Sequence, residues 1–82
     1  MKARQFSTFD VNLASYLLLN AIPPTLERLN TGRVIFLFEP SDKLYEVLAQ
    51  YNGNGLVPIS DYVAALKATR SRMLALRKEG EE

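Results

Sequence analysis

The chain has 82 residues and a formal net charge of +1, with ten basic side chains, nine acidic ones, no histidine and no cysteine. Its length fits one domain. The missing cysteine excludes disulfide bonds, and without histidine or cysteine the usual ligands of zinc and haem are absent. The balanced charge argues against duplex DNA or an anionic membrane as the dominant partner. No apolar run approaches the length that spans a bilayer, so we expect no membrane association.

The first predicted elements are a strand and a helix. Residues 3–8 are predicted to form a short strand. Asp10 follows as a helix cap, because its carboxylate can accept hydrogen bonds from the first free amides of a helix. We expect this helix to run over residues 11–21 and to be buried on several sides, since it is apolar almost all round. Pro23 and Pro24 are expected to end it.

Two strands are predicted next, over residues 25–29 and 33–39, because a short loop containing glycine at residues 30–32 is typical of a hairpin. The second strand is apolar on both faces, whereas an antiparallel strand usually has one solvated face. We therefore expect either helices on both sides of the sheet or a second subunit on one side. The two faces consist of Val34, Phe36 and Phe38 on one side and Ile35 and Leu37 on the other.

Two further helices complete the predicted fold. Ser41 caps the first, which ends at a loop where Gly53 is expected to adopt the left-handed conformation. The second begins within residues 58–61 and runs to about Lys78. The sequence thus predicts one α+β domain over residues 1–78 with a small antiparallel sheet of two or three strands, three helices and the order β-α-β-β-α-α. The polar residues 79–82 are expected to fray.

Titratable residues show no catalytic pattern. Asp10, Asp42 and Asp61 stand at predicted helix starts, where capping and the helix dipole explain them. Glu39 ends a strand, but no metal-ligand spacing accompanies it. We therefore predict a protein that is not an enzyme and that has no catalytic residue, no cofactor and no metal.

Three surfaces are candidates for binding. The first is the loop before the last helix, a ligand or anion site if it is more than an ordinary turn, and it comprises Asn52, Gly53, Asn54 and Gly55. The second is a nucleic-acid or partner face on the last helix, for which we favour the alternative of a solvated face, since a nucleic-acid footprint usually raises the net charge well above zero. No aromatic residue is interleaved there, so stacking of single strands is not expected. It comprises Lys67, Arg70, Arg77 and Lys78.

The third is a self-association surface, suggested by the apolar strand and by a heptad-like stripe that Thr69 interrupts. It comprises Ile35, Leu37, Tyr62, Leu66, Met73 and Leu76. The four tyrosines, which all lie on predicted helices, are expected to pack in the core, with a ligand pocket at a subunit seam as the alternative. They are Tyr16, Tyr45, Tyr51 and Tyr62.

Several segments together resemble a family of small bacterial and bacteriophage proteins that is catalogued only as a domain of unknown function. They are Phe6-Ser7-Thr8-Phe9-Asp10, Leu13-Ala14-Ser15-Tyr16-Leu17, residues 32–39, Tyr51-Asn52-Gly53, Tyr62 and Ala65-Leu66-Lys67. The resemblance covers most of residues 5–73. It implies a bacterial or phage cytoplasmic setting and supplies no catalytic residues.

These observations favour a small non-enzymatic binding or regulatory protein that acts as a homo-oligomer. A counter-defence factor that inhibits a host protein or sequesters a nucleotide signal would fit this description. The alternative is a nucleic-acid-binding protein that uses the basic last helix.

Overall fold

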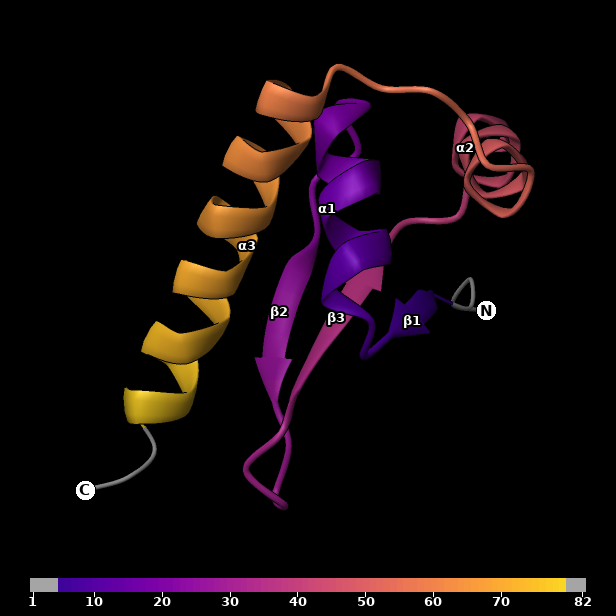
Figure 1. Cartoon of the computed structure of the whole chain (residues 1–82). Helices are drawn as coiled ribbons and strands as arrows, with labels where there is room; N and C mark the ends of the chain where they lie inside the picture. The colour runs from indigo at the N-terminus through magenta and orange to yellow at the C-terminus, as the bar shows by residue number, and fades with distance from the viewer. Residues whose placement is uncertain (1–4, 80–82) are drawn as a thin grey trace.

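The computed structural model describes residues 5–79 and confirms the predicted α+β architecture. Figure 1 shows the elements in the predicted order, with three strands and three helices in the described part of the chain. Their bounds are β1 (Phe6–Thr8), α1 (Val11–Leu19), β2 (Thr25–Arg28), β3 (Val34–Phe38), α2 (Asp42–Asn52) and α3 (Ile59–Glu79). The predicted frayed tail lies outside the described residues except for Glu79, which ends α3.

The sheet is antiparallel with the strand order β1-β3-β2, so the hydrophobic β3 lies at its centre. Phe36 of β3 lies opposite Thr8 of β1 and Leu26 of β2. Directly opposite residues share a face, so these positions belong to the face that packs against helices. Along β3 this face carries three buried side chains, which are Val34, Phe36 and Phe38.

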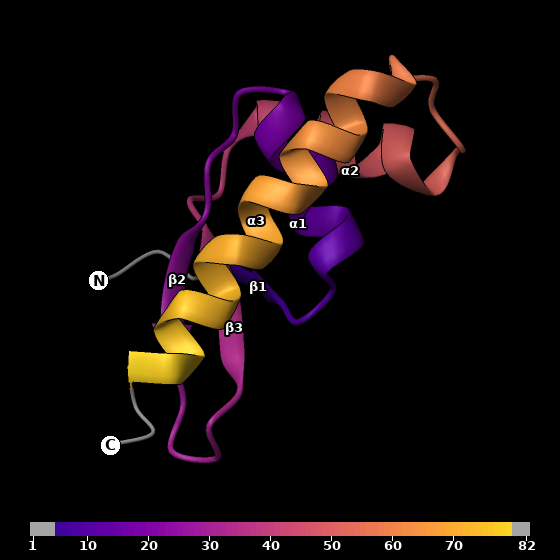
Figure 2. The same cartoon turned by 60° about the vertical axis from the view of Figure 1, so that its left-hand side comes forward.

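The other face of the sheet opens to solvent. Ile35 and Leu37 are only half-buried there, and their cross-strand neighbours Ser7, Thr25 and Glu27 are exposed. Figure 2 shows α1 and α3 lying across the sheet on the same side. The described helices therefore cover one face only, and the expectation of helices on both faces is wrong. The apolar pair on β3 is tolerated because flanking strands shield it in part.

The start of α1 is as predicted, but its end is not. Asp10 accepts hydrogen bonds from the amides of Asn12 (2.9 Å) and Leu13 (3.4 Å), which is the geometry of an N-cap. The helix then ends at Leu19, before the proline pair. Ala21 adopts a left-handed φ of 65°, and this reversal stops the helix.

The start of α2 is also as predicted, whereas the conformation at its end is not. The Ser41 hydroxyl accepts a hydrogen bond from the Leu44 amide at 3.0 Å, as predicted. Gly53, however, has a φ of −87° and is not left-handed. That role belongs to Asn54, with a φ of 65°. Asparagine is one of the few residues that tolerate this conformation, so the prediction was wrong by one position.

The hydrophobic core lies between the covered face of the sheet and all three helices. α1 and α3 contact each other more extensively than any other pair of elements in the described chain. No described helix is long and apolar enough to cross a membrane. Asp42 and Asp61 lie in the first turns of α2 and α3, where a negative charge interacts favourably with the positive end of the helix dipole. The central buried side chains are Ala14, Tyr16, Leu17, Phe36, Phe38, Leu44 and Val47.

Candidate functional site

Three tyrosines from three different helices meet around one cavity of about 370 Å³. Tyr16 comes from α1, Tyr51 from α2 and Tyr62 from α3. The connection between α2 and α3 closes the remaining side. We call this cavity the tyrosine cleft, and its lining residues are Tyr16, Tyr51, Asn54, Gly55, Val57 and Tyr62.

The loop that closes the cleft is held by its own backbone. The Gly55 amide donates to the Gln50 carbonyl at 2.7 Å, and the Asn54 amide donates to the Tyr51 carbonyl at 3.1 Å. The loop also approaches α1 closely, because a Cβ atom on Gly55 would lie 2.6 Å from the Tyr16 hydroxyl oxygen. Only glycine fits this position without a shift of its neighbours.

The tyrosine side chains are fixed by one another and by α1. The rings of Tyr16 and Tyr51 lie edge to face, with centroids 5.2 Å apart and an interplanar angle of 62°. The Tyr62 hydroxyl donates to the Asn12 carbonyl at 3.0 Å. Tyr16 is almost fully buried, whereas Tyr51 and Tyr62 are half-buried. The cleft is thus lined by ordered rings.

Burial is the main cause that raises the pKa of both Tyr51 and Tyr62 above the ordinary value of 10.0. The Asp10 carboxylate adds to the rise of both pKa values, and Tyr51 adds to that of Tyr62. These phenols therefore stay protonated at neutral pH and can donate hydrogen bonds. Among the described residues no lysine or arginine lines the cleft, and the nearby carboxylate disfavours an anion in it.

We expect the raised pKa values to weaken the fold in alkali. A folded-state pKa above the unfolded value contributes stability in full below pH 10, and this contribution is lost as the pH rises through the folded pKa. The free energy of unfolding, measured with urea at a series of pH values, should therefore fall above about pH 10. In a Tyr51→Phe and Tyr62→Phe double variant the fall should be shallower. Tyr45→Phe, outside the cleft, should leave the fall as steep as in the parent. An equally steep fall in the parent, the double variant and Tyr45→Phe would contradict the assignment of the effect to Tyr51 and Tyr62.

The predicted ligand loop is only partly in the site. Asn54 and Gly55 line the tyrosine cleft, whereas Asn52 ends α2 and Gly53 caps it. The loop is also separated from the start of α3 at Ile59 by three residues. The surroundings favour a neutral or cationic ligand over the anion that the glycines suggested. The tyrosines that complete the cleft were predicted to lie on helices, but nothing in their spacing shows that they meet.

The four basic residues of α3 that were predicted to form a nucleic-acid or partner face are all exposed and lie on one flank. At about 100° per residue they fall within an arc of about 100°. We call this surface the basic flank, and it consists of Lys67, Arg70, Arg77 and Lys78. Nothing in the structure distinguishes Lys67 or Lys78 from ordinary solvated side chains.

Arg77 of the basic flank has partners from distant parts of the sequence. It lines a cavity of about 270 Å³ together with Phe9, Arg33, Val34 and Met73. The Arg33 guanidinium stacks on the Phe9 ring, 3.9 Å from its centroid. The sequence showed no aromatic residue interleaved in the basic helix, and the fold brings one there. Phe9 and Arg33 were missed because only tertiary packing unites them with Arg77.

The predicted self-association residues are dispersed. Tyr62 and Met73 pack against the core of their own chain, and Leu66 and Leu76 are half-buried. Ile35 and Leu37 lie on the open face of the sheet. The most exposed large apolar side chains among the described residues are instead Leu56, 99% exposed in the α2–α3 connection, and Ile59, 78% exposed at the start of α3.

The family model of a domain of unknown function, DUF5659, matches residues 3–75. No curated protein and no solved structure matches the chain. The resemblance to a family of unknown function is thereby confirmed. Because the matched segment covers most of the sequence, the chain belongs to the DUF5659 family, a domain of unknown function.

Proposed function

We propose that this chain is a non-enzymatic binding or regulatory protein of bacterial or phage cytoplasm, and that its ligand site is the tyrosine cleft. The observation that carries this proposal is the convergence of Tyr16, Tyr51 and Tyr62 from three helices on one cavity of about 370 Å³. Ligand pockets measure about 300–1,000 Å³, so this cavity suits a small molecule.

The chemistry of the cleft favours a planar nitrogen heterocycle, such as a nucleobase. Aromatic rings offer stacking or edge contacts to a flat ligand. The phenol hydroxyls and the Asn54 amide both donate and accept hydrogen bonds, which matches the mixed edge of a base. Asp10 disfavours a phosphate inside the cleft, so the phosphate of a nucleotide would point to solvent. Such a site would suit a protein that sequesters a nucleotide signal.

The same groups are poorly suited to catalysis. A general base or nucleophile works best when its pKa lies near the operating pH. Burial moves the pKa of Tyr51 and Tyr62 in the opposite direction, away from neutrality. Within the described residues, no three histidine, cysteine, aspartate or glutamate side chains cluster as metal ligands. A binding role therefore accounts for the cleft better than a reaction.

Intrinsic fluorescence tests this function directly, because the chain has four tyrosines and no tryptophan. Titration with adenosine, guanosine, cytidine and uridine should give saturable quenching with at least one nucleoside. Tyr51→Phe should weaken that binding about tenfold, the loss expected when a bound polar group is left without its partner. Tyr45→Phe is the matched control, since Tyr45 lies on the same helix but is 54% exposed. Absence of saturation up to millimolar nucleoside would refute the nucleobase assignment.

We also propose that the chain self-associates, through the exposed apolar side chains of Leu56, Ile59 and Val63. Leu56 lies in the connection just before α3, and Ile59 and Val63 lie one turn apart at the start of that helix. Exposed apolar side chains that gather on a surface mark interaction sites. Sedimentation velocity at micromolar concentration should show a dimer or larger species that Ile59→Ser dissociates. A clean monomer at about 100 micromolar would exclude this role for the surface.

A second candidate function is binding of single-stranded nucleic acid on the basic flank. It is favoured by the cavity where Arg77 meets the stacked pair of Phe9 and Arg33, because guanidinium groups beside an aromatic ring suit phosphates and bases. Affinity for a 20-nucleotide strand should fall steeply with salt, by about 0.7 log units per phosphate contact for each log unit of salt. Arg70→Ala with Arg77→Ala should abolish binding, whereas Lys43→Ala on α2 should not. A salt-independent signal, or none at low salt, would rule this function out.

A further inference from the structure

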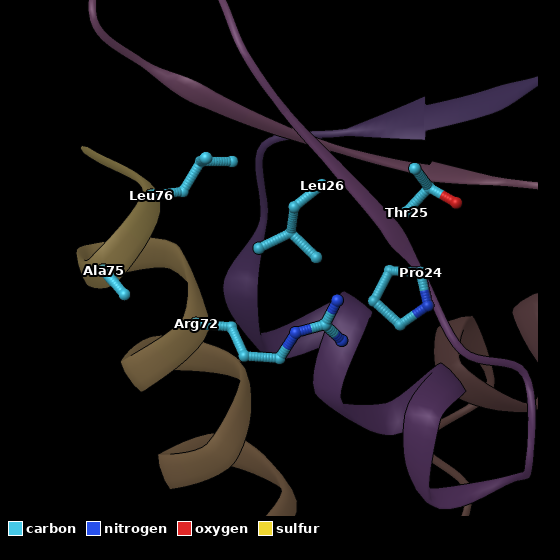
Figure 3. Close-up of a pocket in the computed structure, with 6 residues that line it drawn as sticks. All are labelled: Pro24, Thr25, Leu26, Arg72, Ala75 and Leu76. Carbon is cyan, nitrogen blue, oxygen red and sulfur yellow. The ribbon is translucent and has the colours of Figure 1, made fainter. Parts of the chain in front are cut away.

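A groove of about 440 Å³ separates β2 from the C-terminal half of α3 (Figure 3). It lies apart from the tyrosine cleft and shares no lining residue with it. Four of the described residues that line it are apolar, and Arg72 is the one charged residue among them. We call it the β2 groove, and its lining residues are Pro24, Thr25, Leu26, Arg72, Ala75 and Leu76.

One side of the groove is a free strand edge. Within residues 5–79, β2 pairs with β3 alone, so its outer edge carries backbone groups without a strand partner there. The Leu29 amide donates to the Arg33 carbonyl at 2.8 Å, and this hydrogen bond shows which residues of β2 bond toward β3. Because inward and outward groups alternate in an antiparallel pair, Thr25 and Glu27 bond toward β3. The N–H and C=O of Leu26 therefore point outward, at the groove.

The other side of the groove supplies charge and apolar surface. Figure 3 shows the Arg72 side chain leaving α3 and extending toward Pro24, with the Leu26 side chain directed at α3 beside it. Among the described residues, the Arg72 guanidinium has no hydrogen bond or ion pair. Ala75 and Leu76 form the wall further along the helix. A cation without a partner beside the apolar side chains of Leu26 and Leu76 is complementary to the carboxylate of a peptide that ends there.

We propose that the β2 groove binds the C-terminal peptide of a partner protein, as a strand added antiparallel to β2 with its terminal carboxylate at Arg72. Strand addition of this kind draws affinity from backbone hydrogen bonds and specificity from alternate side chains. Pro24 has no N–H to donate, so the added ladder ends at Leu26. The end of the ladder coincides with the position of the guanidinium, which favours a chain terminus over a peptide that continues. The apolar side chains of Leu26, Ala75 and Leu76 favour an apolar last side chain.

A second copy of this chain is a poor occupant of the same edge. Antiparallel pairing of two β2 strands must place an outward residue opposite an outward residue. The register that pairs Leu26 with Arg28 sets Glu27 opposite Glu27, and like charges directly opposite are destabilising. The register centred on Leu26 pairs Arg28 with Pro24, which cannot donate. The register centred on Arg28 opposes two arginines. Like charges and Pro24 therefore disfavour a second β2 strand at this edge and favour a strand from a different protein.

A library of random hexapeptides displayed with free C termini tests this proposal on the whole protein. Selection should enrich sequences with an apolar last residue. Fluorescence anisotropy should then show that the selected peptide binds at least ten times more tightly as the free acid than as the C-terminal amide. Arg72→Gln should cause a similar loss. Arg70→Gln, on the opposite flank of α3, is the matched control and should bind as the parent does.

The backbone contact has its own readout. On titration with the free-acid peptide, the amide resonance of Leu26 in a ¹⁵N-resolved spectrum should shift and its hydrogen exchange should slow, while those of Tyr51 and Gly55 stay unchanged. Tyr51→Phe should not affect peptide binding, so failure of the nucleobase assignment leaves this test intact. The proposal is overturned if no peptide is enriched, if acid and amide bind equally, if Arg72→Gln binds as tightly as the parent while melting normally, or if the shifts map elsewhere.

Discussion

Replacing Gly55 by alanine is expected to destabilise the fold by about 1–3 kcal/mol and to obstruct the tyrosine cleft. The added Cβ would lie 2.6 Å from the Tyr16 hydroxyl oxygen and 3.0 Å from the Gln50 carbonyl oxygen. Neither neighbour can yield easily. Tyr16 is only 5% exposed, and the carbonyl belongs to the backbone of α2. The α2–α3 connection must therefore move, and three lining residues of the cleft, Asn54, Gly55 and Val57, move with it.

A double-mutant cycle isolates this contact. Tyr16→Phe removes the nearest atom, so Gly55→Ala should cost less in the Tyr16→Phe background than in the parent, with a coupling of about 0.5–3 kcal/mol in urea unfolding. Gly53→Ala is the control in the same loop. Its nearest contact would be 3.2 Å and its φ of −87° is open to alanine, so the change in stability should be smaller than for Gly55→Ala. Strict additivity of Tyr16→Phe and Gly55→Ala would show that the loop does not rest on the tyrosine.

The sequence predicted the helices and strands well because the interactions that fix where they start are made between neighbouring residues. Asp10 and Ser41 cap helices through hydrogen bonds to amides two or three residues away, so their roles depend on a few neighbouring positions. The errors have a related origin. Gly53 and Asn54 can both adopt the left-handed conformation, and the sequence alone does not decide between them. The end of α1 depends on Ala21, a residue for which a positive φ is unusual.

The candidate site was predicted only in fragments, since it depends on how helices pack. Tyr45 and Tyr51 lie on the same helix, six residues apart, and about 100° per residue places them on different faces. One is exposed and the other lines the tyrosine cleft. Periodicity shows that their environments differ, but not which of the two meets Tyr16 and Tyr62. Phe9 and Arg33, separated by 24 positions in the printed sequence, stack on each other for the same tertiary reason.

Thr69 illustrates how a residue that interrupts an apolar stripe can still be part of the core. Its side chain is 1% exposed, on the helix that packs most extensively against α1. Its hydroxyl oxygen is buried and has no hydrogen-bond partner in the part of the chain that the structure describes. By contrast, the buried Ser15 hydroxyl on α1 donates to the Val11 carbonyl at 2.7 Å. Burial of a hydroxyl without a partner costs about 1–3 kcal/mol, so the Thr69 hydroxyl lowers the free energy of unfolding relative to an apolar side chain of the same shape.

Thr69→Val is therefore expected to stabilise the protein by about 1–2 kcal/mol, because valine keeps the shape and removes the hydroxyl. Thermal unfolding should shift upward by about 4–8 °C for each kcal/mol in a domain of this size. Thr69→Ser separates the two contributions, since it keeps the hydroxyl and removes the methyl group, and it should be less stable than the parent. If valine proves destabilising while serine is neutral, the hydroxyl has a partner such as a bound water, and the α1–α3 contact is held by a polar interaction at its centre.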